Sequence, residues 1–286
     1  MENETVNLSV EEEVNQRLNL KMMLFSDPGM GKTTTIASSY DDPRIAPILW
    51  IDVERSQSAI NSKVAPYTLE DLKNNRPPIK GKISYLKISE KSELQKIVSF
   101  LAARSSSKNE VKTPELKAYL QSKDFKPYLG FRTIVIDNLT EVSRIYLQDS
   151  VLVGNKSPDG IIPTLQDYNR RGIAIGDVVR MFRDLNTHTI FTAHAFTKEN
   201  EIKEETIYPS LGGLGLSKEL PGLFQVVGYI KVNPKDDNTR EIIFQPTTGI
   251  IGVKCNLEES EAKKSQVFEK NERVLSKLFD LWHIVK

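Results

Sequence analysis

The chain has 286 residues, 39% of them hydrophobic and 27% charged, which is typical of a soluble globular protein built as one large α/β domain or as a domain with an appendage. Its 39 basic and 38 acidic residues give a formal net charge of +1, so the molecule as a whole does not attract nucleic acid and any DNA contact must be local. One cysteine and three histidines exclude disulfide scaffolds, cysteine-based metal sites and a histidine cluster.

The N-terminus begins Met-Glu-Asn-Glu and lacks the basic and then apolar pattern of a signal peptide. No apolar run approaches the ~20 residues that span a bilayer. Together with the single Cys255, these features predict a cytoplasmic protein that does not enter a membrane.

The first predicted element is a short N-terminal helix. Ser9 is followed three residues later by Glu12, which is the capping-box pattern for a helix through Leu18. Residues 1–17 are therefore interpreted as a lead-in to the main domain.

A strand, a phosphate-binding loop and a helix are expected between residues 20 and 36. Leu20–Phe25 is apolar, the loop Ser26–Lys32 contains two glycines, and the helix starts at Thr33. Glycines let backbone N–H groups face phosphate oxygens, the lysine reaches the β- and γ-phosphates, and the threonine hydroxyl ligates Mg²⁺. Ser26 replaces the first glycine of the general pattern, and the plain alternative is a Gly/Pro turn before a helix. The predicted ATP-binding residues are Pro28, Gly29, Met30, Gly31, Lys32, Thr33 and Thr34.

The next segments complete the first half of a sheet. Residues 46–54 form an apolar run of the kind found in strands buried on both faces, and residues 83–88 predict another strand. Residues 92–104 have apolar positions at helical spacing. Residues 104–114 are polar and turn-rich, and a short helix is expected at 114–121.

Residues 132–137 predict the second strand of the nucleotide site, ending in Asp137. In such a Walker B strand the carboxylate holds Mg²⁺, usually through water; the plain alternative is a strand that ends in a turn. Asn138 follows instead of Glu, so the Asp-Glu pair of AAA+ ATPases is absent and the general base must lie elsewhere. Glu54 ends the strand after the P-loop helix, at the edge where open α/β sheets bind ligands. Glu141 is the second candidate, and a solvated strand-end carboxylate is the plain interpretation of Glu54.

A helix at 173–185 and a strand from His188 to His194 follow. A polar residue closing the strand between the two Walker strands can sense the γ-phosphate, which makes His194 a candidate. An ordinary half-buried histidine is equally consistent with the pattern. His188 and His283 are interpreted as structural or exposed.

The C-terminal part predicts antiparallel strands that extend the parallel sheet, a hairpin turn at residues 236–238, and a long terminal helix from about Glu259. Val267 and Phe268 are among the apolar positions assigned to that helix. We expect it to pack on its own domain; the alternative is docking on a neighbouring subunit. The predicted strands are 207–211, 224–232, 241–245 and 250–254.

Four segments in this order and spacing carry a family resemblance: residues 26–33, 52–54, 136–140 and 192–194. They resemble the RecA/KaiC-type ATPase core and are similar to phage-encoded nucleotide-binding proteins of the RecA-like single-strand annealing group. The resemblance covers residues 18–256, with 257–286 as a C-terminal helix. It implies an α/β fold with a mostly parallel central sheet, a C-terminal antiparallel extension, and ATP and Mg²⁺ as cofactors.

The resemblance also implies roles for residues outside the Walker elements. Glu54 corresponds to the catalytic base, residues 196–216 to a mobile DNA-binding loop, and Lys254 to a basic residue that reaches the ATP of the next subunit in a ring or filament. The sequence departs from the family in two places. Asn256 stands where relatives often carry Arg, and residues 198–206 are acidic on balance, which disfavours phosphate contact. Basic residues that can compensate, or form a solvated helix face, are Arg170, Arg171, Arg180 and Arg183.

Three functions are compatible with these patterns. The favoured one is a Mg²⁺-dependent ATPase acting on single-stranded DNA in phage recombination or replication, in the host cytoplasm, as a homo-oligomer and with a phage or host protein as a further partner. The alternative is a nucleotide-dependent switch with a protein partner and slow hydrolysis. A small-molecule kinase is least favoured because residues 196–216 contain no arginine for a lid. The predicted metal ligands are Thr33 and Asp137; the predicted catalytic residues are Lys32, Glu54, Asp137, His194 and Lys254.

Overall fold

A computed structural model describes residues 19–55, 57–74, 76–105, 130–154, 162–199, 201, 203–233, 236–257 and 264–284. The predicted N-terminal helix and the predicted helix at 114–121 lie outside these ranges. Within them, no helix combines the length and the apolar character needed to cross a membrane.

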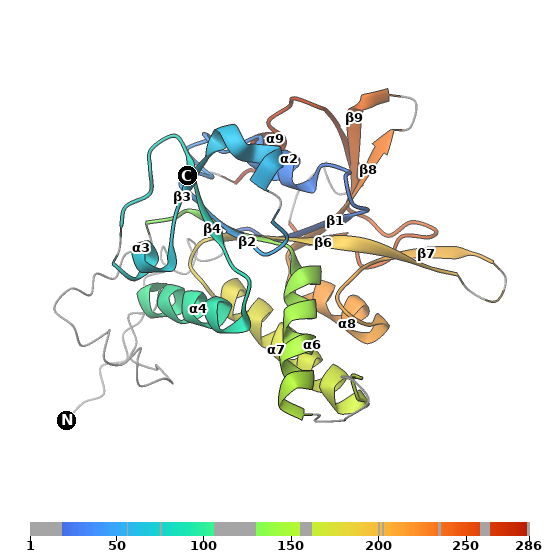
Figure 1. The fold of residues 1–286 in the computed structure, drawn as a ribbon. Coiled ribbons are helices and arrows are strands. Elements are labelled where there is room, and N and C mark those ends of the chain that lie inside the picture. The colour runs from blue at the N-terminus through green and yellow to red at the C-terminus, as the bar shows by residue number, and fades with distance from the viewer. Residues whose placement is uncertain are drawn as a thin grey trace, which may run out of the picture.

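The described strands form one sheet with the phosphate-loop strand β1 near its centre (Figure 1). The sheet order is β11-β9-β8-β1-β6-β5-β2-β4-β3, with β10 paired to β8 and β7 paired to β6. The ladders from β8 through β1, β6, β5, β2 and β4 to β3 are all parallel. The strands are β1 Lys21–Ser26, β2 Ile48–Asp52, β3 Val64–Pro66, β4 Ile83–Lys87, β5 Thr133–Asp137, β6 His188–Glu199, β7 Glu205–Pro209, β8 Val226–Asn233, β9 Asp236–Ile243, β10 Lys254–Cys255 and β11 Ser265–Glu269.

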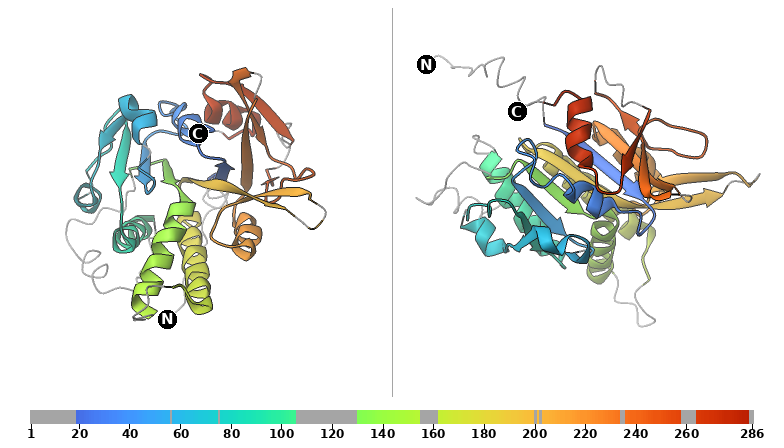
Figure 2. Two further views of the ribbon diagram at one scale, coloured as in Figure 1. Left: turned by 45° about the vertical axis from the view of Figure 1, so that its right-hand side comes forward. Right: turned by 90° about the horizontal axis from the view of Figure 1, so that it is seen from above.

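Helices cover both faces of the sheet (Figures 1 and 2). The phosphate-loop helix α2 and the C-terminal helix α9 lie on one face, and α4, α6, α7 and α8 lie on the other. The helices are α2 Lys32–Ala37, η1 Gln57–Lys63, α3 Leu69–Lys73, α4 Lys91–Ser105, α6 Leu139–Gly154, α7 Leu165–Arg183, α8 Leu214–Glu219, η2 Leu220–Leu223 and α9 Val274–Leu281.

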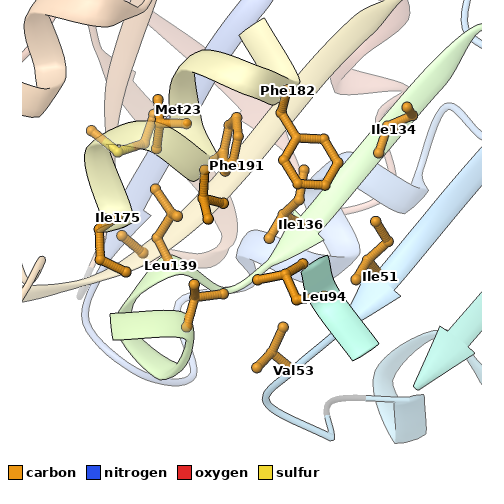
Figure 3. Packing of buried hydrophobic residues seen from close by; sticks show 14 of the residues in the cluster. Met23, Ile51, Val53, Leu94, Ile134, Ile136, Leu139, Ile175, Phe182 and Phe191 are labelled. Carbon is orange, nitrogen blue, oxygen red and sulfur yellow. The ribbon is translucent and has the colours of Figure 1, made fainter. Parts of the chain in front are cut away.

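The two helix layers explain why the central strands carry apolar residues on both faces. In β5, Ile134 and Ile136 pack into the core under α4, α6 and α7, whereas Val135 packs into the core under α2 and α9. Phe182 of α7 and Phe191 of β6 meet edge to face in the first of these cores, with ring centroids 5.9 Å apart (Figure 3). A strand covered on both faces thus loses the apolar and polar alternation of a half-exposed strand.

The predicted central strands are confirmed, and β6 lies between β1 and β5 as expected. The predicted end of this strand at His194 is wrong, because β6 continues to Glu199 and pairs with β7, so the expected loop 196–216 contains a β ribbon and α8. The predicted C-terminal antiparallel extension is confirmed in β7, β9, β10 and β11, but three C-terminal predictions are wrong in detail. The strand β8 is parallel to β1, so it continues the parallel sheet instead of extending it antiparallel. Asn233 pairs with Asp236, so β9 begins where the turn was predicted. Only Lys254 of the predicted strand 250–254 is in β10.

The predicted long C-terminal helix is also wrong. Residues 265–269 form β11, in which Phe268 is 1% exposed and its neighbour Val267 is 62% exposed. This alternation is that of a strand, and the helical spacing was coincidental. The helix α9 begins only at Val274, whose N–H donates to the Ser38 hydroxyl at the end of α2 over 3.0 Å. The prediction that the terminal helix packs on its own domain is confirmed.

Candidate active site

The phosphate-binding loop lies at the carboxyl end of β1. Gly29 and Gly31 have φ angles of 80° and 84°, a backbone conformation that residues with a Cβ rarely adopt. Gly31 directly precedes α2 as its N-cap. A Cβ at Gly31 would also lie 2.7 Å from Nε of Arg240. The backbone conformation therefore favours glycine at position 31, and a larger residue would also have to displace the end of the flexible Arg240 side chain.

Lys32 is buried at the base of this loop, with 5% of its surface exposed. Its ammonium group donates to the carbonyl oxygens of Ser26 and Asp27 at 3.1 and 3.2 Å and to the Ser26 hydroxyl at 3.2 Å. Burial lowers the pKa of Lys32, while the carboxylates of Glu54 and Asp137 act in the opposite direction. Ser26, which replaces the first glycine of the pattern, thus fits the loop and adds an acceptor for the lysine.

The two predicted metal ligands meet in the structure. The Thr33 hydroxyl donates to Oδ2 of Asp137 over 2.9 Å, and Asp137 is fully buried. The Thr192 hydroxyl donates to the other oxygen, Oδ1. A hydroxyl and a carboxylate oxygen are ligands that suit Mg²⁺, which keeps its other positions for water and phosphate. The donor set therefore fits the predicted Mg²⁺ site.

Glu54 lies just beyond β2, next to the end of β5, because its N–H donates to the Asp137 carbonyl over 3.2 Å. Its Oε1 lies 3.0 Å from Nε2 of His194, and its Oε2 accepts a hydrogen bond from the Asn138 amide. The hydrogen bond from His194 is the largest cause that lowers the pKa of Glu54; partial burial opposes it. The geometry thus favours an ionised Glu54 carboxylate at neutral pH.

His194 connects Glu54 to the P-loop lysine. Its Nδ1 lies 3.4 Å from Nζ of Lys32, and an ammonium group can only donate, so Nδ1 is the acceptor. In this tautomer the Nε2–H group faces Glu54, and the 3.2 Å contact of Nε2 with the Asn138 amide nitrogen is then not a hydrogen bond. The backbone N–H of His194 donates to the Thr140 hydroxyl over 2.9 Å, which fixes the middle of β6 against the start of α6. The structure therefore brings together four of the five predicted catalytic residues: Lys32, Glu54, Asp137 and His194.

Lys254 is the predicted catalytic residue that the structure does not bring to this cluster. It lies in β10, where its Nζ donates to the Gly222 carbonyl over 3.0 Å and burial lowers its pKa. Glu141, the second candidate for the base, pairs instead with Arg144 one helical turn away, at 2.8 Å. Within one chain, Glu54 is thus the candidate base that contacts the Walker elements.

Asn138 and Thr192 are site residues that the sequence analysis missed. The sequence pattern drew attention to Asn138 only because it stands in place of Glu. In the structure its Oδ1 accepts the Glu141 N–H over 2.9 Å as the N-cap of α6, and its amide N–H donates to Glu54. An asparagine directly before a predicted helix is a sequence signal for such a cap. Thr192 lies in the segment 192–194 that carries the resemblance, but its contact with Asp137 comes only from the pairing of β5 with β6.

Comparison with known proteins agrees with this geometry. Residues 18–253 match the family described as "AAA domain". No curated protein matches the chain. Among solved structures the chain is similar to the crystal structure of the RadB recombinase, with 12% sequence identity, a TM-score of 0.38, and coverage of 80% of this chain and 84% of that chain. Because β6 separates the two Walker strands, the sheet has the strand order of a P-loop ATPase. Since the family match spans most of the chain, the chain belongs to the AAA domain family.

Proposed function

We propose that the protein binds Mg²⁺-ATP at the P-loop, hydrolyses it with Glu54 as general base, and acts on single-stranded DNA. The observation that carries the hydrolysis proposal is the Glu54 carboxylate, held by His194 and Asn138 beside the Lys32 ammonium. A carboxylate has about four lone-pair sites, of which these two donors use two. The remaining sites can orient a water and accept its proton.

The other residues of the cluster have complementary roles in this proposal. Lys32 stabilises charge on the β- and γ-phosphates, and Thr33 and Asp137 hold the metal ion. When bound, Mg²⁺ neutralises the charge that develops on the phosphate oxygens. His194 joins the lysine to the base, so it can transmit the presence of the γ-phosphate to Glu54.

The DNA part of the proposal is supported by a pocket of about 870 Å³ between α7, α8 and η2. Arg171 and the glycines 212 and 213 are among the residues that line it. Arg171 is 6% exposed and its guanidinium lies 4.9 Å from the ring centroid of Tyr168. The Arg171 guanidinium packs against Gly212, where a Cβ would lie 2.7 Å from its Cζ. A guanidinium binds phosphate in two-pronged fashion.

Arg171 differs from the other basic residues of α7. Arg170, Arg180 and Arg183 each pair with an aspartate close in sequence, at 3.8, 3.2 and 2.7 Å. In the part of the chain that the structure describes, Arg171 has no carboxylate partner and its buried Nε has no hydrogen-bond acceptor. Of the four basic residues, Arg171 is therefore the one best prepared for an anionic ligand.

The switch with a protein partner remains the second candidate, because the β6–β7 ribbon that projects from the sheet is acidic (Figure 1). Glu199 and Glu205 face each other in the ribbon, and both are exposed, as are Glu201 and Glu204. Such a surface repels a phosphate backbone and attracts a basic protein surface. The phage setting and its recombination or replication role rest on the motif resemblance.

The first experiment measures steady-state ATP hydrolysis with and without oligo-dT. We expect DNA to stimulate hydrolysis in the wild type and expect Lys32→Ala and Glu54→Gln to abolish it. Glu141→Gln is the matched control and should retain activity, since Glu141 pairs with Arg144. A rate of ATP hydrolysis that DNA does not change favours the switch with a protein partner. Full activity of Glu54→Gln would exclude Glu54 as the base.

The second experiment titrates labelled oligo-dT by fluorescence anisotropy at several salt concentrations. We expect Arg171→Gln to weaken binding and to reduce the dependence on salt. Arg183→Gln is the control, because its guanidinium is already paired with Asp184. Equal weakening by both variants would contradict a specific contact at Arg171.

We also propose that Lys254 acts on the ATP of a neighbouring subunit in a homo-oligomer. A mixture of Lys254→Ala and Lys32→Ala subunits tests this, because one variant has an intact P-loop and the other an intact Lys254. Recovery of activity above the sum of the separate variants is expected for action in trans. Its absence, with mixed oligomers shown by light scattering, would contradict it.

A further inference from the structure

Arg240 of β9 lies against the P-loop, although it is more than 200 residues away in sequence and two strands away from β1 in the sheet. A Cβ at Gly31 would be 2.7 Å from its Nε and 2.8 Å from its Nη2. The guanidinium is thus in contact with the backbone of the glycine that precedes Lys32. No sequence motif assigned Arg240 to the nucleotide site.

The charge of Arg240 is only partly compensated. Its Nη1 donates to the Lys270 carbonyl over 3.2 Å, but its buried Nε has no acceptor among the described residues. Burial lowers its pKa, and no carboxylate within the described ranges counteracts this effect. Arg240 is partly buried, and a partly buried cation without a counter-ion gains from an anionic partner. A guanidinium with free N–H groups matches a phosphate in shape and charge.

We propose that Arg240 is a nucleotide-binding residue, which β9 supplies to the P-loop of its own chain and which contacts the α- or β-phosphate. This inference rests on the proposed nucleotide binding. The position follows from Gly31, because the backbone N–H groups of the loop hold the α- and β-phosphates whereas the lysine reaches the β- and γ-phosphates. Arg240 therefore binds ADP and ATP alike, unlike His194, which is placed to respond to the γ-phosphate.

The test is calorimetric titration of ADP and of a non-hydrolysable ATP analogue, each with Mg²⁺, into wild-type protein and Arg240→Gln. We expect the variant to bind both nucleotides about tenfold more weakly, the effect of losing one charge-assisted hydrogen bond. Arg240→Lys keeps the charge but not the planar fork, so its affinity should lie between the two. The matched control is Arg273→Gln, an exposed arginine that pairs with Asp41 near α2 and should bind as the wild type does.

Several outcomes would overturn the inference. Unchanged affinity in Arg240→Gln would make Arg240 a structural contact with Gly31 and Lys270 only. Tighter binding would show that the guanidinium obstructs the site. Loss of affinity for the ATP analogue alone would place the contact at the γ-phosphate. Failure of the wild type to bind either nucleotide would instead refute the proposed function itself. Thermal unfolding of each variant separates weak binding from incomplete folding.

Discussion

Asn138 offers a sharp test because one side chain performs two tasks. Its Oδ1 caps α6 through the Glu141 N–H over 2.9 Å, and its amide donates to Glu54. Losing the cap costs about 1 kcal/mol. Losing the second bond costs about 1 kcal/mol, less than is usual for a charged acceptor, because the Glu54 side chain is 31% exposed and water can replace the donor. Asn138→Ala should thus be about 2 kcal/mol less stable.

A protein of this size changes its melting temperature by roughly 2–4 °C per kcal/mol, so we expect Asn138→Ala to melt about 4–8 °C below the wild type. Asn138→Asp separates the two tasks. Aspartate caps a helix as well as asparagine does, but it places a second carboxylate against Glu54. The melting temperature of Asn138→Asp should lie furthest below that of the wild type at neutral pH, and the difference should shrink as pH falls. The reason is that repulsion between the two carboxylates raises the pKa of Glu54 until one proton is shared.

Thermal unfolding followed by circular dichroism between pH 4.5 and 8 measures both effects. Asn61→Ala is the control, since Asn61 is exposed and its side chain accepts a hydrogen bond from the half-buried Gln57 over 3.2 Å; it should stay within about 1 °C of the wild type. Equal melting temperatures of Asn138→Ala and the Asn61→Ala control would refute the reasoning. An Asn138→Asp deficit that does not depend on pH would refute the contact with Glu54.

Three further outcomes are expected. His194→Gln removes the largest cause that lowers the pKa of Glu54; because the base form exists only above this pKa, the acid limb of the pH–rate profile should move to higher pH, and an unmoved limb would exclude the coupling. Thr192→Val keeps the side-chain shape but removes the hydroxyl that orients Asp137 through one carboxylate oxygen. The Mg²⁺ concentration needed for nucleotide binding should therefore rise about tenfold. An unchanged Mg²⁺ titration would count against this orienting role of Thr192. Ser39→Ala removes the acceptor of a backbone N–H in the first turn of α9 at 3.0 Å; it should cost about 1 kcal/mol and speed hydrogen exchange in α9, whereas equal exchange would show that the cap is dispensable.

The sequence alone determined the nucleotide site to a large extent. The apolar runs ending at Ser26 and Asp137 predicted the two Walker strands, because a strand buried on both faces has no polar alternation. The Gly-Met-Gly-Lys-Thr segment predicted the loop, since only glycine suits the positive φ at positions 29 and 31. The observed strand order agrees with the prediction that β6 lies between β1 and β5.

Other features were decided only by tertiary structure. The C-terminal apolar positions fitted helical spacing, but pairing with β9 made residues 265–269 a strand with Phe268 inside. Asn138, Thr192 and Arg240 joined the site through hydrogen bonds and contacts with residues far away in sequence. Local sequence patterns indicate whether a segment is helical or extended and which residues a turn requires. They do not indicate which strands are neighbours in the sheet. Those neighbours decide whether a polar side chain has a hydrogen-bond partner.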